Sequence, residues 1–433
     1  MKKRILIILI ISIFPFLAQG QDIDHNSKLA DLINTGRWID TKEYLLEHKD
    51  QITDFMQLLG SSMVNTFTNN PSEAVQNINS LINKYESQIG DQILQFYGLL
   101  LNNYDELQEY DKSVEICDKI LKLDGLYQDL INGTIQRKEW CRKRVQWPKL
   151  VVNSSNKKST ILNFKKSQNS SGILFKILCN NNRLNAIFDT GSSVTCLNKD
   201  IASRIGVRYV NDTILLNKTA KAQTGIIDSI SLGEYTIYNF PVVVYIDSIE
   251  NQQYQTEYKI MQAKKSLEEF DIILGMSFLK LFEEIQLDNR NQKICFSGKS
   301  TEVKERIRMQ LVNNSLYIKV LINDCNFIGL FDTGLNLDLL INNAFYAQHK
   351  NNFINPNNIN SRKQILRLNG REELKGVIPA NITVNLCNRR LNPSNSLILA
   401  DTRYGYDGII GDFVLKESDF IVFNFKDMWF YCK

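Results

Sequence analysis

Histidine is scarce in this sequence, and the motifs of several common enzyme classes are missing. The 433 residues contain only His25, His48 and His349, and none stands in the His-Glu-x-x-His spacing with which zinc peptidases bind their metal. There is no Gly-x-Ser-x-Gly turn, no phosphate-binding loop and no Gly-x-Gly-x-x-Gly run. These absences argue against a zinc peptidase, a serine hydrolase of that type and a nucleotide-binding enzyme.

Eight cysteines in 433 residues are too few for disulfide bonds to be the main support of the fold. No Cys-x-x-Cys pair occurs, so neither a zinc ribbon nor a thioredoxin-like redox site is supported. We expect buried thiols or an occasional bridge, with the pairing left open. The eight positions are Cys117, Cys141, Cys179, Cys196, Cys295, Cys325, Cys387 and Cys432.

An excess of one charge is also lacking. Of the 51 Lys and Arg residues, Lys2, Lys3 and Arg4 begin the chain, which leaves 48 basic against 47 acidic residues. A near-zero balance offers no basic surface of the kind that nucleic acid requires, so a nucleic-acid partner is not expected.

The first 20 residues read as a secretory signal peptide. The three basic residues precede an apolar run from Ile5 to Leu17 and the exit Ala18-Gln19-Gly20. The run is shorter than the roughly 20 residues that span a bilayer, and no Cys follows the exit to suggest a lipid anchor. We expect export to the periplasm or the extracellular space, with no transmembrane anchor in the mature chain.

Residues 21–145 read as an α-helical domain. Apolar residues recur at spacings of three and four, and a helix over 95–107 is predicted to turn at Gln108-Glu109 into a second helix near Asp111. The run YDELQEYDKSVEICDKIL resembles a tetratricopeptide repeat, and 71–85 resembles a degenerate copy of its second helix. The resemblance implies a platform for a protein partner; a plain helical packing domain is the alternative.

After a polar linker at 153–158 the chain reads as all-β, and one pattern occurs twice. An apolar run ends in Asp189-Thr190-Gly191-Ser192, and FDIILG follows at 270–275. A second apolar run ends in Asp332-Thr333-Gly334, and YDGIIG follows at 406–411. The glycine that ends each later run, Gly275 or Gly411, is called the closing glycine. It lies at a similar distance from its aspartate in the two copies, 275 − 189 = 86 and 411 − 332 = 79 residues. A single Asp-Thr-Gly would be weak evidence, whereas two copies with matching context are not accidental.

These motifs resemble the aspartic peptidases, most closely two retropepsin-like lobes fused in tandem. The resemblance implies two all-β acid-protease lobes, 146–300 and 301–433, that form one pseudo-twofold bilobal unit and complete the catalytic dyad within one chain. With the helical domain, the fold class is α+β and multidomain. The family pattern implies that Thr190 and Thr333 hydrogen-bond across the dyad.

The residue types suit acid-base chemistry on a water molecule. Two adjacent carboxyl groups hold one proton over a wide pH range, so Asp189 and Asp332 can act as general base and general acid. Gly191 and Gly334 permit the tight turns. The closing strands Ile273-Leu274-Gly275 and Ile409-Ile410-Gly411 are expected to pack behind the turns. No cofactor and no metal are expected.

The two copies differ at one position beside the dyad. By resemblance, the Ser192 hydroxyl donates to the outer oxygen of the dyad, and Leu335 stands at the matching place and cannot donate. Loss of a donor to the ionised form raises a carboxyl pKa, so activity at less acidic pH is expected. Residues 217–227 and 368–377 are candidate flaps, with ordinary surface loops as the alternative.

The sequence therefore predicts an aspartic endopeptidase that hydrolyses polypeptides through a water activated by Asp189 and Asp332. Thr190, Gly191, Ser192, Thr333 and Gly334 are predicted to support the catalytic loops. The alternative is a non-catalytic peptide- or protein-binding protein with a degenerate peptidase fold, to which Leu335 lends support. Substrate, cleavage specificity and oligomeric state are not readable from the sequence.

Overall fold

The computed structural model describes most of the chain and divides it into two compact units. It describes residues 24–154, 159–167, 172–216, 220–245, 268–353, 360–367, 370–401 and 406–433. The units are Met1–Lys149 and Leu150–Lys433, here called the helical unit and the β unit. The predicted signal peptide, 1–20, lies outside the described residues. None of the helices in the described ranges is long and apolar enough to cross a membrane.

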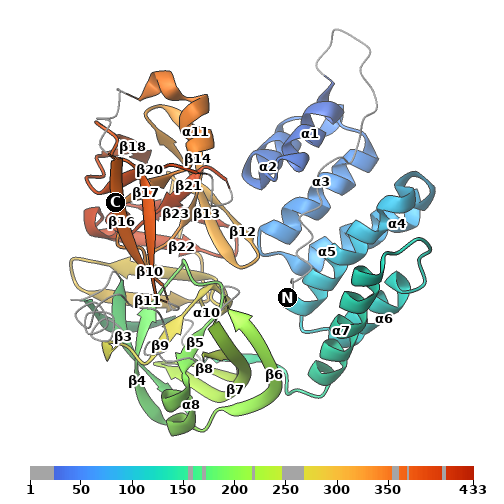
Figure 1. The fold of residues 1–433 in the computed structure, drawn as a ribbon, viewed down its shortest axis with the longest axis horizontal. Coiled ribbons are helices and arrows are strands. Elements are labelled where there is room, and N and C mark those ends of the chain that lie inside the picture. The colour runs from blue at the N-terminus through green and yellow to red at the C-terminus, as the bar shows by residue number, and fades with distance from the viewer. Residues whose placement is uncertain are drawn as a thin grey trace. The chain divides into compact units, whose positions relative to one another are not determined.

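The helical unit is a run of helices in which each packs against the next (Figure 1). The bounds are α1 His25–Asn34, α2 Trp38–Glu47, α3 Asp54–Phe67, α4 Pro71–Ile89, α5 Ile93–Glu106, α6 Tyr110–Ile120 and α7 Gln128–Val145, with short 3-10 turns at Lys49–Gln51 and Gly90–Gln92. Leu29, Ile78 and Leu100 are fully buried or nearly so and share the core side of these helices. The helix pair that the sequence predicts around Gln108-Glu109 is α5 and α6, and its turn depends on a positive φ of 56° at Gln108.

The β unit consists of two halves that repeat one set of strands. The first half contains β1 Val151–Ser154, β2 Ser159–Lys166, β3 Ile173–Cys179, β4 Asn182–Phe188, β5 Cys196–Asn198, α8 Lys199–Ile205, β6 Arg208–Leu216, β7 Ala220–Leu232, β8 Tyr235–Tyr245, β9 Ile272–Leu274, α10 Met276–Leu279, β10 Glu284–Asp288 and β11 Lys293–Ser297. The second half contains β12 Ile307–Val312, β13 Ser315–Ile322, β14 Cys325–Phe331, β15 Leu339–Ile341, α11 Asn343–Gln348, a 3-10 turn at Lys350–Asn352, β16 Asn360–Arg367, β17 Gly370–Val377, β18 Val384–Leu386, β19 Arg389–Leu391, β20 Ser396–Leu399, β21 Gly408–Ile410, α12 Phe413–Glu417, β22 Phe420–Asn424 and β23 Trp429–Cys432.

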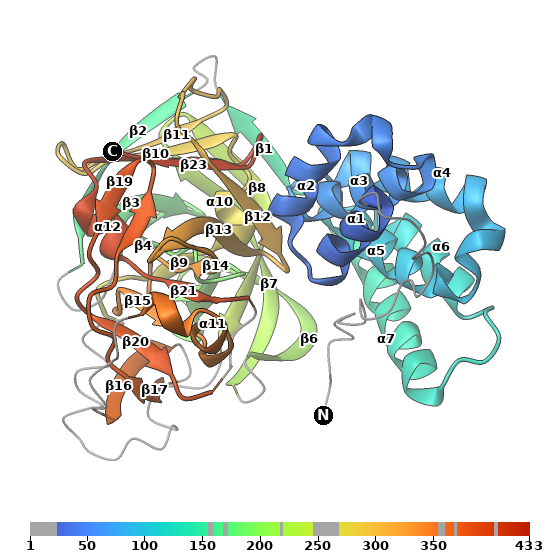
Figure 2. The same ribbon diagram turned by 90° about the horizontal axis from the view of Figure 1, so that it is seen from above.

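The strand pairings of the first half recur in the second. The β3–β4 hairpin matches β13–β14, and the long β6–β7 hairpin matches β16–β17. Strand β4 pairs in parallel with β9, as β14 does with β21, and the short strands β5 and β15 each run antiparallel to that closing strand. In Figure 1 the strands of the first half, in green, lie below those of the second half, in orange to red, and Figure 2 looks onto the second half from above. Each half therefore places its Asp-Thr-Gly turn at the end of the second strand of a hairpin.

A six-stranded antiparallel sheet joins the halves. Its order is β2–β11–β10–β22–β23–β12, so strands from the two halves meet where β10 pairs with β22. One apolar core runs through both halves and includes this sheet. Phe423 on β22 contacts Phe188 and Phe331 at ring-centroid distances of 5.6 and 5.7 Å. Phe188 and Phe331 immediately precede Asp189 and Asp332. The buried ring of Phe423 therefore packs against the residues that lead into both turns.

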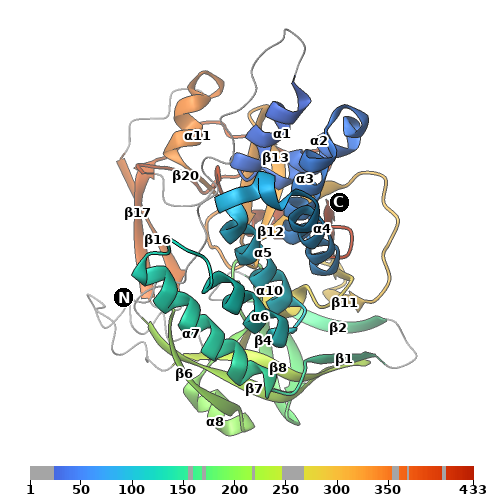
Figure 3. The ribbon, with the colours of Figure 1, turned by 90° about the vertical axis from the view of Figure 1, so that its right-hand side faces the viewer.

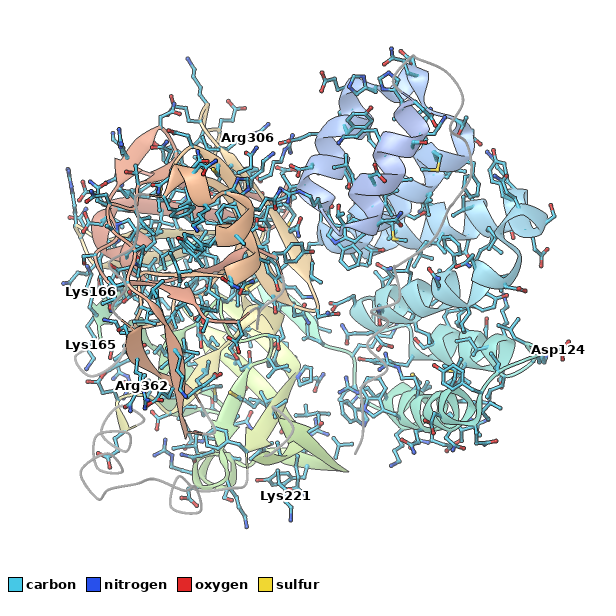
Figure 4. All side chains as sticks on the ribbon, turned by 45° about the horizontal axis from the view of Figure 1, so that its top comes forward. Asp124, Lys165, Lys166, Lys221, Arg306 and Arg362 are labelled. Atoms are coloured by element: carbon cyan, nitrogen blue, oxygen red, sulfur yellow. The ribbon has the colours of Figure 1, made fainter. Side chains whose placement is uncertain are left out.

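A buried polar cluster also crosses between the halves. Glu284 on β10 is fully buried and accepts hydrogen bonds from the Thr301 N–H at 2.8 Å and from the Asn424 side-chain amide at 3.0 Å. A buried carboxylate is tolerated only when donors replace its water. Many other charged side chains lie at the surface, as Figure 4 shows for Asp124 on the helical unit and for Lys165, Lys166 and Lys221 on the β unit.

Candidate active site

The two Asp-Thr-Gly turns are held at the ends of matching strands. The Asp189 N–H donates to the carbonyl of Leu274 at 3.2 Å, and the Asp332 N–H donates to that of Ile410 at 2.9 Å. Each aspartate therefore leaves the sheet directly beside a closing strand. Gly275 follows the first closing strand, and a Cβ placed on it would lie 2.3 Å from the Val194 carbonyl oxygen. Only glycine permits this approach of two backbones, as the sequence predicts.

The two carboxyl groups lie together, each against the glycine of the opposite turn. A Cβ placed on Gly191 would lie 2.1 Å from Oδ1 of Asp332, and one placed on Gly334 would lie 2.9 Å from Oδ1 of Asp189. Within its own turn, each carboxylate also accepts a 2.9 Å hydrogen bond, Asp189 from the Gly191 N–H and Asp332 from the Gly334 N–H. The structure thus brings together two acids that are 143 residues apart (332 − 189) in the sequence.

Reciprocal threonine bonds lock the turns to each other. The Thr190 N–H donates to Oγ1 of Thr333 at 3.0 Å, and the Thr333 N–H donates to Oγ1 of Thr190 at 3.1 Å. Each hydroxyl in turn donates to a carbonyl of the opposite strand, Thr190 to Phe331 at 2.6 Å and Thr333 to Phe188 at 3.3 Å. Both threonines are fully buried. Because buried N–H groups must be paired, these bonds fix the relative position of the two turns.

Two further aspartates hold the closing strands, and the sequence interpretation assigned them no role. Oδ2 of Asp271 accepts from the Asn185 N–H at 2.8 Å, and Oδ2 of Asp407 accepts from the Ile328 N–H at 2.7 Å. Asp271 and Asp407 each stand four residues before the closing glycine of their copy. The repeated motif that revealed Asp189 and Asp332 therefore contains these two aspartates as well. Arg204 on α8 additionally forms a 2.9 Å ion pair with Asp271.

The electrostatics of the site favour a shared proton. Burial raises the pKa of the Asp189 carboxyl group, and the neighbouring charge of Asp332 raises it further, to about 7. Hydrogen bonds from the backbone N–H groups of Gly191, Ser192 and Gly334 lower the pKa of Asp189 and offset part of this rise. Both carboxyl groups are half-buried, so they remain within reach of water. A pair of this kind holds one proton across the acidic and near-neutral range.

The Ser192 hydroxyl does not make the hydrogen bond expected of it. It donates to the Val194 carbonyl at 2.8 Å, and the contribution of Ser192 to Asp189 comes from its backbone N–H. A hydroxyl has a single proton, so a bond to its own turn leaves none for the dyad. At the matching place Leu335 is 5 % exposed and packs with Leu337, Leu340 and Leu374.

The candidate flaps fall on the two long hairpins. Residues 217–219 and 368–369 of these segments lie outside the described residues. The described parts of 220–227 and 370–377 are paired strands of β7 and β17 rather than loops. Figure 3 shows the β16–β17 hairpin beside β20, with which β17 pairs. Whether these segments close over a substrate stays a prediction.

The described residues also include no group of three or more His, Cys, Asp or Glu side chains arranged to hold a metal ion.

Comparison with known proteins points to one family for the first half of the β unit. Residues 175–278 match the family model described as aspartyl protease, which covers about a quarter of the chain and includes Asp189 and its closing strand. No curated protein matches the chain. The match supports a relationship of this part of the chain to aspartyl proteases.

Two solved structures are among those to which the chain is similar. The first is the aspartic proteinase from Irpex lacteus, with 12% identity, a TM-score of 0.39 and coverage of 64% of this chain and 97% of that one. The second is a retropepsin-like aspartic protease from Rickettsia conorii, with 17% identity, a TM-score of 0.22 and coverage of 34% of this chain and 95% of that one.

Proposed function

We propose that this protein is an aspartic endopeptidase in which Asp189 and Asp332 act together on a water molecule. One observation carries the proposal: the two turns lie against each other, so that each carboxyl group contacts the glycine of the opposite turn. The doubled Asp-Thr-Gly motif and the aspartyl protease match over 175–278 support the same conclusion.

The proposed chemistry needs one proton on the pair. The ionised aspartate removes a proton from the bound water, which attacks the carbonyl carbon of the peptide bond. The protonated aspartate donates to the carbonyl oxygen, and a proton then passes to the departing amine nitrogen. The C–N bond breaks without a covalent enzyme intermediate. The N–H groups of Gly191 and Gly334 hold the carboxylates in place for these transfers.

The arrangement is proposed to be two lobes related by a pseudo-twofold axis, residues 146–300 and 301–433. Support comes from the strand pairings that occur in both halves and from the reciprocal threonine bonds. On this proposal a single chain completes the dyad. The helical domain, 21–145, is proposed to bind a protein partner through its tetratricopeptide-like helices, and the leader, 1–20, to direct export.

The pH range of activity is proposed to extend toward neutrality. The raised pKa of Asp189 keeps one proton on the pair up to about pH 7, above which both groups ionise and the acid is lost. The absence of a side-chain donor at Leu335, and the direction of the Ser192 hydroxyl toward Val194, fit a site that does little to stabilise the doubly ionised pair. An activity optimum below about pH 4 would refute this point.

A second candidate is a protein that captures peptides without cutting them. Leu335 favours it, because an apolar side chain buried in the second turn departs from the hydroxyl of the first copy. The intact pair of acids favours the enzyme.

Cleavage of an unstructured protein such as casein from pH 3 to 8 distinguishes the two. The mature chain should cleave casein, pepstatin should inhibit it, and Asp189→Asn and Asp332→Asn should each abolish cleavage. If the folded chain leaves casein intact at every pH but retards its peptides in a binding assay, the endopeptidase proposal is wrong and the binding candidate is supported.

A further inference from the structure

Among the cysteines of the β unit, one pair is in contact. Cys387 lies at the turn between β18 and β19, with a φ of 49°, and Cys432 is the last residue of β23. The Cys432 N–H donates to Sγ of Cys387 at 3.2 Å, across 45 residues of sequence. The two thiols also hydrogen-bond each other. The sequence interpretation left the pairing of cysteines open, and the β18–β19 turn brings these two together.

The surroundings of this pair favour a reactive thiolate. The hydrogen bond with Cys387 lowers the pKa of Cys432, and bonds to Ser418 and Arg389 together with the charge of Arg389 lower it further, against burial. Arg389 is itself oriented by a 3.1 Å bond to Oγ of Ser418. Cys387 is half-buried, which leaves a path for a small reagent to this thiol, whereas Cys432 is buried. The cationic neighbour favours a thiolate on Cys432 and partial exposure gives access at Cys387, so the pair together supplies the two conditions under which a cysteine reacts.

The helical unit supplies a contrasting pair. Cys117 on α6 and Cys141 on α7 interact electrostatically, but both are completely buried. Burial raises the pKa of Cys117 to about 12 and also raises that of Cys141. Such thiols stay protonated and out of reach of an oxidant. Although both pairs bring two thiols close, they differ in electrostatics and in the access to one thiol, since only Cys387 among these four cysteines is half-buried rather than buried.

We propose that Cys387 and Cys432 form a disulfide bond that fastens the C-terminal strand to the β18–β19 hairpin. The oxidant is a disulfide-bearing molecule of an oxidising compartment, such as a disulfide-exchange protein or oxidised glutathione. Cys387, the accessible thiol, passes its proton to the Cys432 thiolate through their hydrogen bond and attacks one sulfur of that molecule, which gives a mixed disulfide on Cys387 and releases one thiolate. The Cys432 thiol then loses its proton and attacks the Cys387 sulfur, which closes the bond and releases the second thiolate. Two electrons pass to the oxidant, and the two protons from the cysteines end on its two thiols or in solvent.

The bond would secure the sheet under the candidate active site. Strand β23 lies between β22 and β12, and its Phe430 contacts Phe331, the residue before Asp332, at 5.3 Å between ring centroids. A covalent link at Cys432, the last residue of β23, would keep this strand paired with β22 and β12. The inference rests on the contact geometry and stands whether or not the dyad cleaves peptides.

Peptide mapping after redox equilibration tests the proposal. The full mature chain is equilibrated with oxidised glutathione, quenched with acid and alkylated, and its peptides are identified by mass spectrometry. We expect a cross-linked peptide containing Cys387 and Cys432, two mass units lighter than its reduced parts, while Cys117 and Cys141 are found alkylated after denaturation. Alkylation of both Cys387 and Cys432 under these conditions, or a different partner for either, would overturn the proposal.

Thermal unfolding with and without dithiothreitol provides a second readout. Reduction should lower the Tm of the oxidised β unit by about 5–10 °C, because the bond closes a long loop in the unfolded chain. Cys387→Ser, at a half-buried position that tolerates the change, should remove the response to dithiothreitol, whereas Cys117→Ser should keep it. Equal Tm values for the oxidised and reduced wild-type chain would refute the stabilising bond.

Discussion

The carboxyl group of Asp189 gives the site a pH-dependent stability of its own. Its pKa is raised from 3.8 to about 7 by burial and by Asp332, so the folded chain keeps a proton that the unfolded chain releases between these values. This contribution favours folding below about pH 4 and is lost as the pH rises through 7. Each tenfold difference in proton affinity between the folded and unfolded chain corresponds to about 1.4 kcal/mol in the free energy of unfolding.

Asp189→Asn should therefore raise the Tm of the β unit at pH 8, and the difference from wild type should shrink toward pH 3. Tm is measured at closely spaced pH values across this range. Asp124→Asn, at an exposed position of the helical unit, is the control and should leave the curve unchanged. If Asp189→Asn keeps the wild-type dependence on pH, the acid does not hold its proton as described.

The glycines of the two turns should not be equally sensitive. A Cβ on Gly191 would press to 2.1 Å from Asp332, while one on Gly334 would stay 2.9 Å from Asp189. We expect Gly191→Ala to lower kcat/KM by about 100-fold or more, since displacement of a catalytic group by about 1 Å costs that much, and Gly334→Ala to lower it less. Gly206→Ala, at a φ of 71° where the added Cβ meets open space, strains the backbone without touching the two acids and should keep kcat/KM. Equal activities of the two turn variants would contradict the geometry.

At the scale of single residues, the sequence located the acids but not their surroundings. Asp189 and Asp332 were recognisable because the motif and its spacing recur. The bond of the Ser192 hydroxyl to Val194 depends on a side-chain rotamer that no sequence pattern reports. Asp271 and Asp407 were visible in the repeat, but their role emerges only when their strands lie next to Asn185 and Ile328.

At the scale of elements, the threonine bonds make the two turns a single unit. Thr190→Val removes the donor to Phe331 and leaves the buried Thr333 N–H without its acceptor. The expected loss is about 1–3 kcal/mol in the free energy of unfolding. Thr333→Val should cost less, because its bond to Phe188 is 3.3 Å rather than 2.6 Å long.

Urea unfolding of the β unit measures these losses. Thr190→Ser and Thr333→Ser retain the hydroxyl groups and serve as matched controls with smaller losses. Valine and serine variants of equal stability would show that the hydroxyls do not link the turns.

Secondary structure was predictable where the pattern is local. The helices α5 and α6 and the turn at Gln108 follow from apolar spacing. The six-stranded sheet was not predictable, because β11 pairs with β2 and β12 pairs with β23, which are far away in the sequence. Alternation of apolar and polar residues indicates that a segment is a strand but does not indicate which strand it pairs with.

At the scale of the whole β unit, Phe423 connects the shared sheet to both turns. Phe423→Ala opens a cavity under Phe188 and Phe331, with an expected cost of about 3–5 kcal/mol and a loss of activity from displaced acids. Phe345→Ala is a suitable control, because Phe345 is also buried but its ring contacts Phe327 and Phe353 rather than Phe188 and Phe331. It should lower stability to a similar extent and retain kcat/KM at 25 °C. Equal losses of activity in the two variants would mean that Phe423 acts through stability alone.

The central claim is that Asp189 and Asp332 form one catalytic group. The most direct test is kcat/KM on a single peptide substrate for wild type, Asp189→Asn, Asp332→Asn and the double variant, at the pH optimum. Residues that act as a unit are not additive, so each single variant should lose at least about 1,000-fold and the double variant no more than either. A single variant that retains a tenth of wild-type activity, or a double variant whose loss is the product of the two single losses, would contradict the account.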